Sequence, residues 1–202
     1  MTFDELIDTA RAPSKIQQFF DCYNAARTDA AVASKEALPL RLFAPLMPNI
    51  ILIECVGSDQ MIYKIAGENI IARMGFNPKG INLLDVLPVK ARDISRSIQE
   101  TIFGYPCGLY CVYENSYASG NRSVTETILL PLSKQPGTQP NLFLTYNIHH
   151  APTGVAESDG KMKLANRFET GAFIDIGSGA PSHEEAVALK QKVFSTFETN
   201  DV

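Results

Sequence analysis

Two of the four cysteines in this chain stand close enough together to act as a pair. Cys107 and Cys111 are four residues apart, so a β-strand would place both on one face. Such a thiol pair could bind a metal or respond to oxidants. The C-x-x-C spacing of zinc sites is missing, however, and no second pair follows. We favour the alternative of two small buried apolar side chains, and we predict no metal site.

Two histidines and one glutamate are the candidates for acid–base chemistry. His149 and His150 are adjacent at a predicted strand end, where neighbouring side chains point to opposite faces. They are therefore poorly placed to share a metal ion, and no nucleophile is paired with them in the sequence. Glu54 follows an apolar run, and burial would raise its pKa and make it a candidate acid. On the open face of an antiparallel sheet it would be an ordinary carboxylate, so no catalytic residue is assigned.

Common catalytic signatures are missing from the 202 residues, including the P-loop, the dinucleotide glycine motif, G-x-S-x-G and H-E-x-x-H. A net charge of −4 argues against a broad nucleic-acid surface, which needs clustered lysine and arginine. The N-terminus MTFDELIDTA lacks the basic and apolar regions of a signal peptide. No apolar run approaches the roughly 20 residues of a membrane helix. We therefore expect a cytoplasmic protein with reduced cysteines that binds neither nucleic acid nor membrane.

The elements that would position these residues follow from hydrophobic periodicity. Strands are predicted at 49–56, 60–66, 108–113, 123–132 and 142–149. Helices are predicted at 68–74, 83–87 and 89–103, between the second and third strands. The short turn at 57–59 makes the first two strands an antiparallel hairpin. This order predicts an α+β fold: one five-stranded antiparallel sheet with helices on one face.

Both ends of the chain are predicted to be helical extensions of a core at 38–150. The N-terminal extension, 1–37, contains a helix at 13–33 whose apolar stripe is formed by Ile16, Phe19, Phe20 and Tyr23. The C-terminal extension, 151–202, contains a possible strand at 167–176. A further helix is predicted to run from 182 to 197, because Ser182 and Glu185 have the spacing of a capping box.

Residues 38–150 resemble a family of short bacterial PAS-like proteins that lack an attached output domain. The resemblance is carried mainly by glycine and apolar placements, and 173–177 resembles the family more weakly. The matching segments are Leu46-Met47-Pro48, Tyr63-Lys64-Ile65-Ala66-Gly67, Ile70 with Arg73-Met74-Gly75, Gly80-Ile81-Asn82-Leu83-Leu84-Asp85, Gly104-Tyr105-Pro106 and Leu129-Leu130-Pro131-Leu132. These motifs are informative about fold and nearly silent about chemistry.

The resemblance implies a cavity between the sheet and the helical block, lined by apolar groups and a few polar contacts. The candidate ligand-binding residues are Tyr63, Met74, Ile98, Tyr110, Ile128 and Tyr146. The alternative is that these side chains fill a closed core. Flavin photosensor members use a cysteine in the helical block, and 75–84 has none. Haem-binding members present a histidine from the long helix, and 89–103 has none, so neither a flavin adduct nor haem is expected and the ligand stays unknown.

The resemblance implies a non-catalytic sensory or adaptor protein that binds a small ligand, a signalling partner, or both. PAS-like domains often dimerise through a flanking helix, so a homodimer through Ile16, Phe19, Phe20 and Tyr23 is expected. One alternative is a small α+β enzyme of the cone-shaped isomerase type, with Glu54 or His149 facing a pocket. Another is a structural interaction protein without a ligand.

Overall fold

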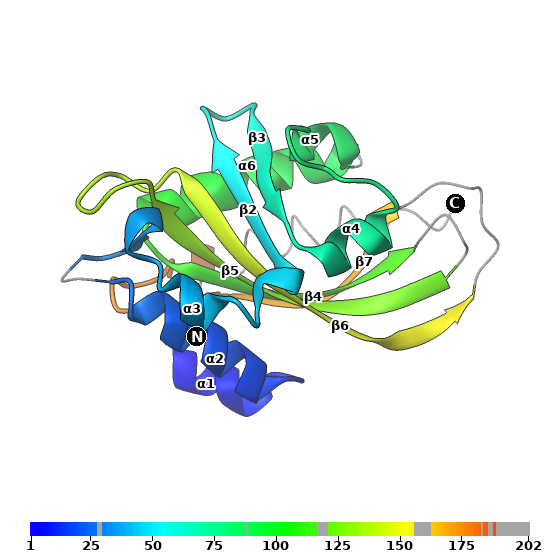
Figure 1. The fold of residues 1–202 in the computed structure, drawn as a ribbon, viewed down its shortest axis with the longest axis horizontal. Helices are drawn as coiled ribbons and strands as arrows, with labels where there is room; N and C mark the ends of the chain where they lie inside the picture. Colours follow the sequence, from blue (N-terminus) through cyan, green and yellow to red (C-terminus); the bar gives the residue numbers. More distant parts are fainter. Residues whose placement is uncertain are drawn as a thin grey trace.

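Six strands of one sheet form the centre of the protein (Figure 1). A computed structural model describes residues 1–27, 30–87, 89–116, 121–155 and 163–182, with 184, 185 and 188. The spatial order is β3-β2-β6-β5-β4-β7, and every neighbouring pair on this path is antiparallel. The strands are β2 (Ile50–Cys55), β3 (Met61–Ala66), β4 (Gly108–Ser116), β5 (Asn121–Ser133), β6 (Leu142–Val155) and β7 (Lys163–Ile174).

The α+β fold with an antiparallel sheet is confirmed, and the sheet is larger than the five strands predicted. The uncertain strand at 167–176 is β7, which pairs with β4 at the sheet edge. A seventh, two-residue strand, β1 (Ala33–Ser34), pairs in parallel with the end of β5. With two residues, β1 is too short to show an alternation pattern. β7 contains a glycine and several charged residues, so its sequence does not strongly indicate a strand either.

Helices cover both faces of the sheet. The helical block consists of α4 (Glu68–Met74), α5 (Leu83–Val86) and α6 (Val89–Gly104), and α5 and α6 pack on one face, here called the block face. The other face, here called the N-terminal face, is covered by α1 (Phe3–Thr9), α2 (Pro13–Asn24) and α3 (Leu40–Phe43). Two 3-10 turns, η1 (Lys35–Ala37) and η2 (Met47–Asn49), complete the N-terminal half. Figure 1 shows α1 to α3 on the opposite side of the strands from α6.

The apolar stripe of α2 packs on the sheet of its own chain. Ile16, Phe19 and Tyr23 are fully buried and Phe20 is 8% exposed. Phe19 stacks on Tyr146 of β6 with ring centroids 5.4 Å apart. The expected homodimer surface at these four residues is therefore wrong, because an apolar stripe needs a partner and the sheet provides it.

The predicted helix ends agree with the structure only in part. The helix expected at 13–33 ends at Asn24, and Thr28 and Asp29 lie outside the described residues. Most of the helix predicted at 182–197 also lies outside them. Its capping box is present, because the Glu185 backbone N–H donates to Ser182 Oγ at 3.2 Å and the Ser182 N–H donates to Glu185 Oε2 at 2.8 Å. Among the described residues, no helix combines the length and apolar character that crossing a bilayer requires.

A close backbone approach joins η2 to the start of α4. Gly67 caps α4, and a Cβ built on it would lie 2.2 Å from the Met47 carbonyl oxygen and 2.3 Å from that of Pro48. The Gly67 N–H also donates to the Ile50 carbonyl at 2.8 Å. Only glycine fits here, which gives the Leu46-Met47-Pro48 segment and Gly67 a shared structural role.

Candidate functional site

The six residues predicted to line one cavity are divided between the two faces of the sheet. Tyr63 and Ile98 belong to the apolar cluster of the block face, and Met74 is the half-buried last residue of α4. Tyr110, Ile128 and Tyr146 belong to the cluster of the N-terminal face. These last three therefore pack beneath α1 to α3 and do not line a space under the helical block.

Beyond its apolar half, the block face carries a group of uncharged polar side chains. Strand alternation places the odd-numbered residues of β4, β5 and β6 on this face. We call the following residues the polar patch: Tyr113, Asn115, Thr125, Thr127, Thr145, Asn147 and His149. Five of them are at least 94% buried, namely Asn115, Thr125, Thr127, Thr145 and Asn147. Buried polar groups of this kind need hydrogen-bond partners, and two chains of hydrogen bonds supply them.

The first chain of hydrogen bonds crosses β4, β5 and β6. The hydroxyls of Tyr113 and Thr127 lie 3.1 Å apart, and Thr127 donates to Asn147 Oδ1 at 2.9 Å. The Asn147 amide then donates to Thr145 Oγ1 at 3.0 Å and to the Asn49 carbonyl at 3.4 Å. The chain thereby links the centre of the sheet to η2, which precedes β2.

The second chain ends at a histidine with one ring nitrogen unpartnered. Asn115 Nδ2 donates to Thr125 Oγ1 at 3.0 Å, and that hydroxyl lies 3.0 Å from His149 Nδ1. Asn115 Oδ1 accepts from the Ala165 N–H of β7 at 2.8 Å. His149 Nε2 is shielded from solvent and has no hydrogen-bond partner among the described residues. Burial, together with the nearby charges of Arg73 on α4 and of His150, lowers the pKa of His149 to about 3.

The polar patch is suited to bind an uncharged group. With a pKa of about 3, His149 is neutral at physiological pH, and the other members carry no ionised group. Its free Nε2 can accept or donate one hydrogen bond, depending on the tautomer. Among the residues that the structure describes, no group of three His, Cys, Asp or Glu side chains could hold a metal ion.

The other reactive side chains lie elsewhere. Glu54 is on the N-terminal face, where it pairs with Lys64 and Lys134. Hydrogen bonds from Lys134 and, to a smaller extent, from Lys64 keep the pKa of Glu54 below its usual range. Burial raises the pKa of Cys55 and Cys107 to about 12, so both are protonated, weakly nucleophilic thiols.

Sequence reasoning did not identify the polar patch, although its signal is present. Thr125 and Thr127 alternate with apolar residues in β5, and Thr145, Asn147 and His149 do so in β6. Such alternation normally indicates a strand with one solvated face. In a sheet covered on both faces, it indicates a buried polar surface.

The depressed pKa of His149 predicts that the protein loses stability as the pH is lowered. The unfolded chain takes up a proton near pH 6.5, whereas folded His149 stays neutral down to about pH 3. Stability is therefore complete above pH 6.5 and is lost progressively as pH falls from 6.5 toward 3. From pH 7 to pH 5.5 we expect a loss of about 1 kcal/mol, which His149→Gln should largely remove. Urea denaturation at the two pH values tests this; an equal loss in both proteins would contradict it.

A comparison with known protein families agrees with this architecture. A family model described as a PAS domain matches residues 11–146, which is well over half of the chain. Among solved structures, the crystal structure of the Rhodobacter sphaeroides LOV protein is similar, with a TM-score of 0.41 and 14% identity over 69% of this chain and 70% of that one. No curated protein sequence matches the chain. The extent of the family match, from just before α2 into β6, shows that this chain belongs to the PAS domain family.

Proposed function

We propose that this PAS domain is a sensor that binds a small uncharged molecule at the polar patch. The observation that carries the proposal is His149 Nε2, a solvent-shielded ring nitrogen without a partner among the described residues. Leaving such an atom unsatisfied costs about 1–3 kcal/mol, which a ligand hydrogen bond would offset. Asn115 and Thr125 hold the imidazole from its other side, so the free nitrogen has a defined direction.

The pKa values favour binding over the isomerase alternative. A general acid or base works best with a pKa near the working pH. Glu54 has a lowered pKa, and His149 has a pKa of about 3, so neither is tuned for proton transfer near pH 7. Glu54 and His149 also lie on opposite faces of the sheet and cannot act on one substrate.

A route for the signal runs through α4. After burial, the charge of Arg73 on α4 is the next cause of the lowered pKa of His149, so the helix and the imidazole are electrostatically coupled. A ligand that bonds to Nε2 changes the polarity at this position and therefore the environment of α4. We propose that displacement of α4 reports occupancy to a signalling partner.

Thermal unfolding with a library of uncharged heterocycles and amides tests the proposal. A ligand at about 100 times its Kd should stabilise the protein by about 2.7 kcal/mol, which raises Tm by roughly 5–10 °C. Thr125→Val removes the hydroxyl that orients His149 at nearly constant volume, and it should reduce the shift at least by half. Thr170→Val, at an exposed position of β7, is the matched control and should leave it unchanged. Failure of every compound, or equal shifts in both variants, would refute binding at the polar patch.

A further inference from the structure

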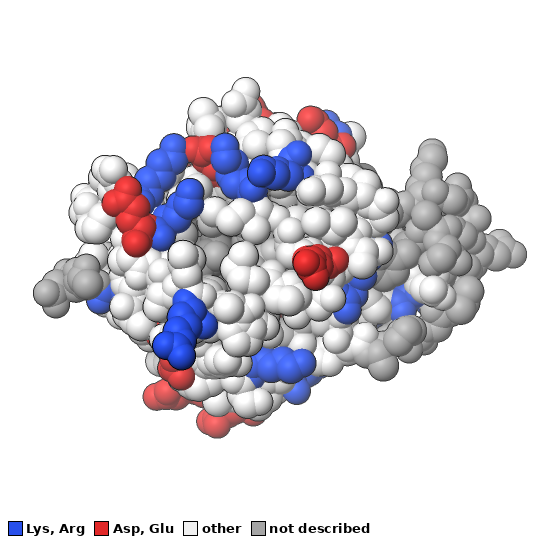
Figure 2. Space-filling view, in the orientation of Figure 1, with Lys and Arg blue, Asp and Glu red and all other residues white. Residues whose placement is uncertain are grey.

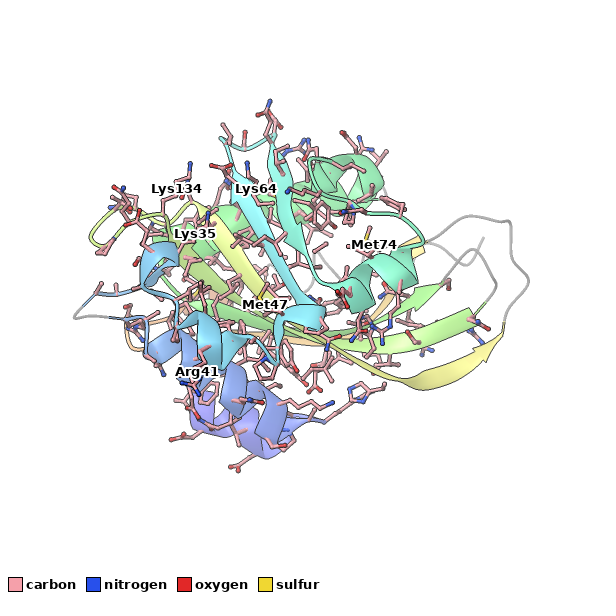
Figure 3. All side chains as sticks on the ribbon, viewed as in Figure 1. Lys35, Arg41, Met47, Lys64, Met74 and Lys134 are labelled. Atoms are coloured by element: carbon pink, nitrogen blue, oxygen red, sulfur yellow. The ribbon has the colours of Figure 1, made fainter. Side chains whose placement is uncertain are left out.

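A groove on the N-terminal face gathers three lysines from three separate segments of the chain. Its volume is about 960 Å³, and the ammonium groups belong to Lys35, Lys64 and Lys134. In Figure 2 basic side chains, with acidic side chains among them, border a hollow in the upper left of the surface, where Figure 3 labels these three lysines. We call it the lysine groove.

The parallel pairing of β1 with β5 delivers two of the three lysines to the same edge. Ser34 is opposite Ser133, so the residues that follow, Lys35 and Lys134, leave the sheet side by side. The Ser133 hydroxyl lies 3.3 Å from the Ala33 carbonyl and 2.9 Å from the Gln135 carbonyl. The backbone from which both lysines extend is therefore held by these hydrogen bonds.

A β-bulge directs the third lysine. Leu52 pairs with Ile65 and Ile53 with Tyr63, so Lys64 is the extra residue of β3. Bulges re-aim side chains, and here Lys64 faces Glu54 at 2.9 Å. Glu54 also pairs with Lys134, and it holds the two ammonium groups together while each keeps further N–H donors. Lys35 has no ion-pair or hydrogen-bond partner for its ammonium group among the described residues.

We propose that the lysine groove binds the phosphate group of a small organic phosphate ester. Lysine ammoniums are compact point charges that suit phosphate oxygens, and Lys35 is available to make the first contact. The amides of Gln139 and Asn141 line the same groove and offer hydrogen bonds to the organic part, whereas Gln135 Nε2 already donates to Glu36, which also lines the groove, at 3.3 Å. The volume is at the upper end of the range for small-molecule sites. This site is independent of the polar patch, because the two lie on opposite faces of the sheet.

NMR titration of the ¹⁵N-labelled protein tests the inference. The panel is AMP, glycerol 3-phosphate, glucose 6-phosphate and pyridoxal phosphate, with inorganic phosphate and adenosine as controls. At least one ester should shift the amides of Gln139, Asn141 and Leu142 with a Kd below 1 mM. Lys35→Gln should weaken binding about tenfold through loss of one charged contact. Raising the salt concentration from 50 to 500 mM should weaken it as well.

Lys79→Gln is the matched control, because Lys79 is an exposed lysine of the 77–80 turn, away from the groove. It should leave the Kd unchanged. The inference is overturned if no ester of the panel shifts the groove amides. It is also overturned if inorganic phosphate or adenosine binds as tightly as the best ester, or if Lys35→Gln and Lys79→Gln behave alike. None of these results bears on ligand binding at the polar patch.

Discussion

Gly67→Ala is expected to destabilise the protein by more than 3 kcal/mol and to reduce soluble expression sharply. The added methyl carbon would lie 2.2 and 2.3 Å from two backbone carbonyl oxygens, those of Met47 and Pro48. Overpacking against mobile side chains typically costs about 1–3 kcal/mol, and backbone atoms cannot move aside as easily. Either η2 or the start of α4 must shift, and both adjoin β2. Urea denaturation followed by circular dichroism measures the change.

Gly104→Ala is the control for this prediction. Gly104 ends α6, and nothing lies within 4 Å of its added Cβ. Alanine lowers the entropy of the unfolded chain, so we expect a change between zero and about 1 kcal/mol of stabilisation. If Gly67→Ala proved as stable as Gly104→Ala, the close approach of η2 to α4 would be wrong.

Glu126→Leu is expected to cost about 3–5 kcal/mol. The Glu126 carboxylate is fully buried on the N-terminal face. It accepts from the Arg11 backbone N–H at 2.8 Å and from the Tyr110 hydroxyl at 2.7 Å, and its second oxygen lies 3.2 Å from His150 Nε2. Leucine fills the volume but leaves these groups without a partner, each at about 1–3 kcal/mol. The loss should appear in urea denaturation and as faster hydrogen exchange in α1 and α2.

Glu126→Gln separates hydrogen bonding from simple packing. The amide oxygen can still accept from Arg11 and Tyr110, so a loss of only about 1 kcal/mol is expected. A leucine variant that is as stable as the glutamine variant would show that this carboxylate does not anchor the N-terminal helices.

The strands could be predicted from the sequence because their alternation is strong and a short turn joins the first two. What the alternation could not reveal was which face lies under the helical block. Val124, Glu126 and Ile128 form one set and Thr125, Thr127 and Leu129 the other, and all of them are buried except the half-buried Leu129. Periodicity separates two faces but does not identify their cover, which is why Tyr110, Ile128 and Tyr146 were assigned to the wrong side.

The stripe of α2 illustrates a second limit. Ile16, Phe19 and Tyr23 show that the helix must bury one side, but the pattern is the same whether the partner is another chain or the same one. The contact that decides it joins residues far apart in sequence: Tyr23 donates to the Pro131 carbonyl at 2.7 Å. The polar patch was missed for a related reason. Threonine and asparagine in a strand give no sequence signal of a binding site, and only the fold shows that they are buried together.

The bulge at Lys64 also bears on how the edge of the sheet is protected from pairing with another chain. β3 forms one edge of the sheet, and an open edge can template pairing with another chain. Here the edge strand has only six residues, an irregular register and a charged side chain at the irregularity. Asn82 occupies part of the remaining edge through a bridge to Ile62. Without the bulge, β3 would thus present a regular strand edge that favours aggregation, and Lys64 would also leave the lysine groove.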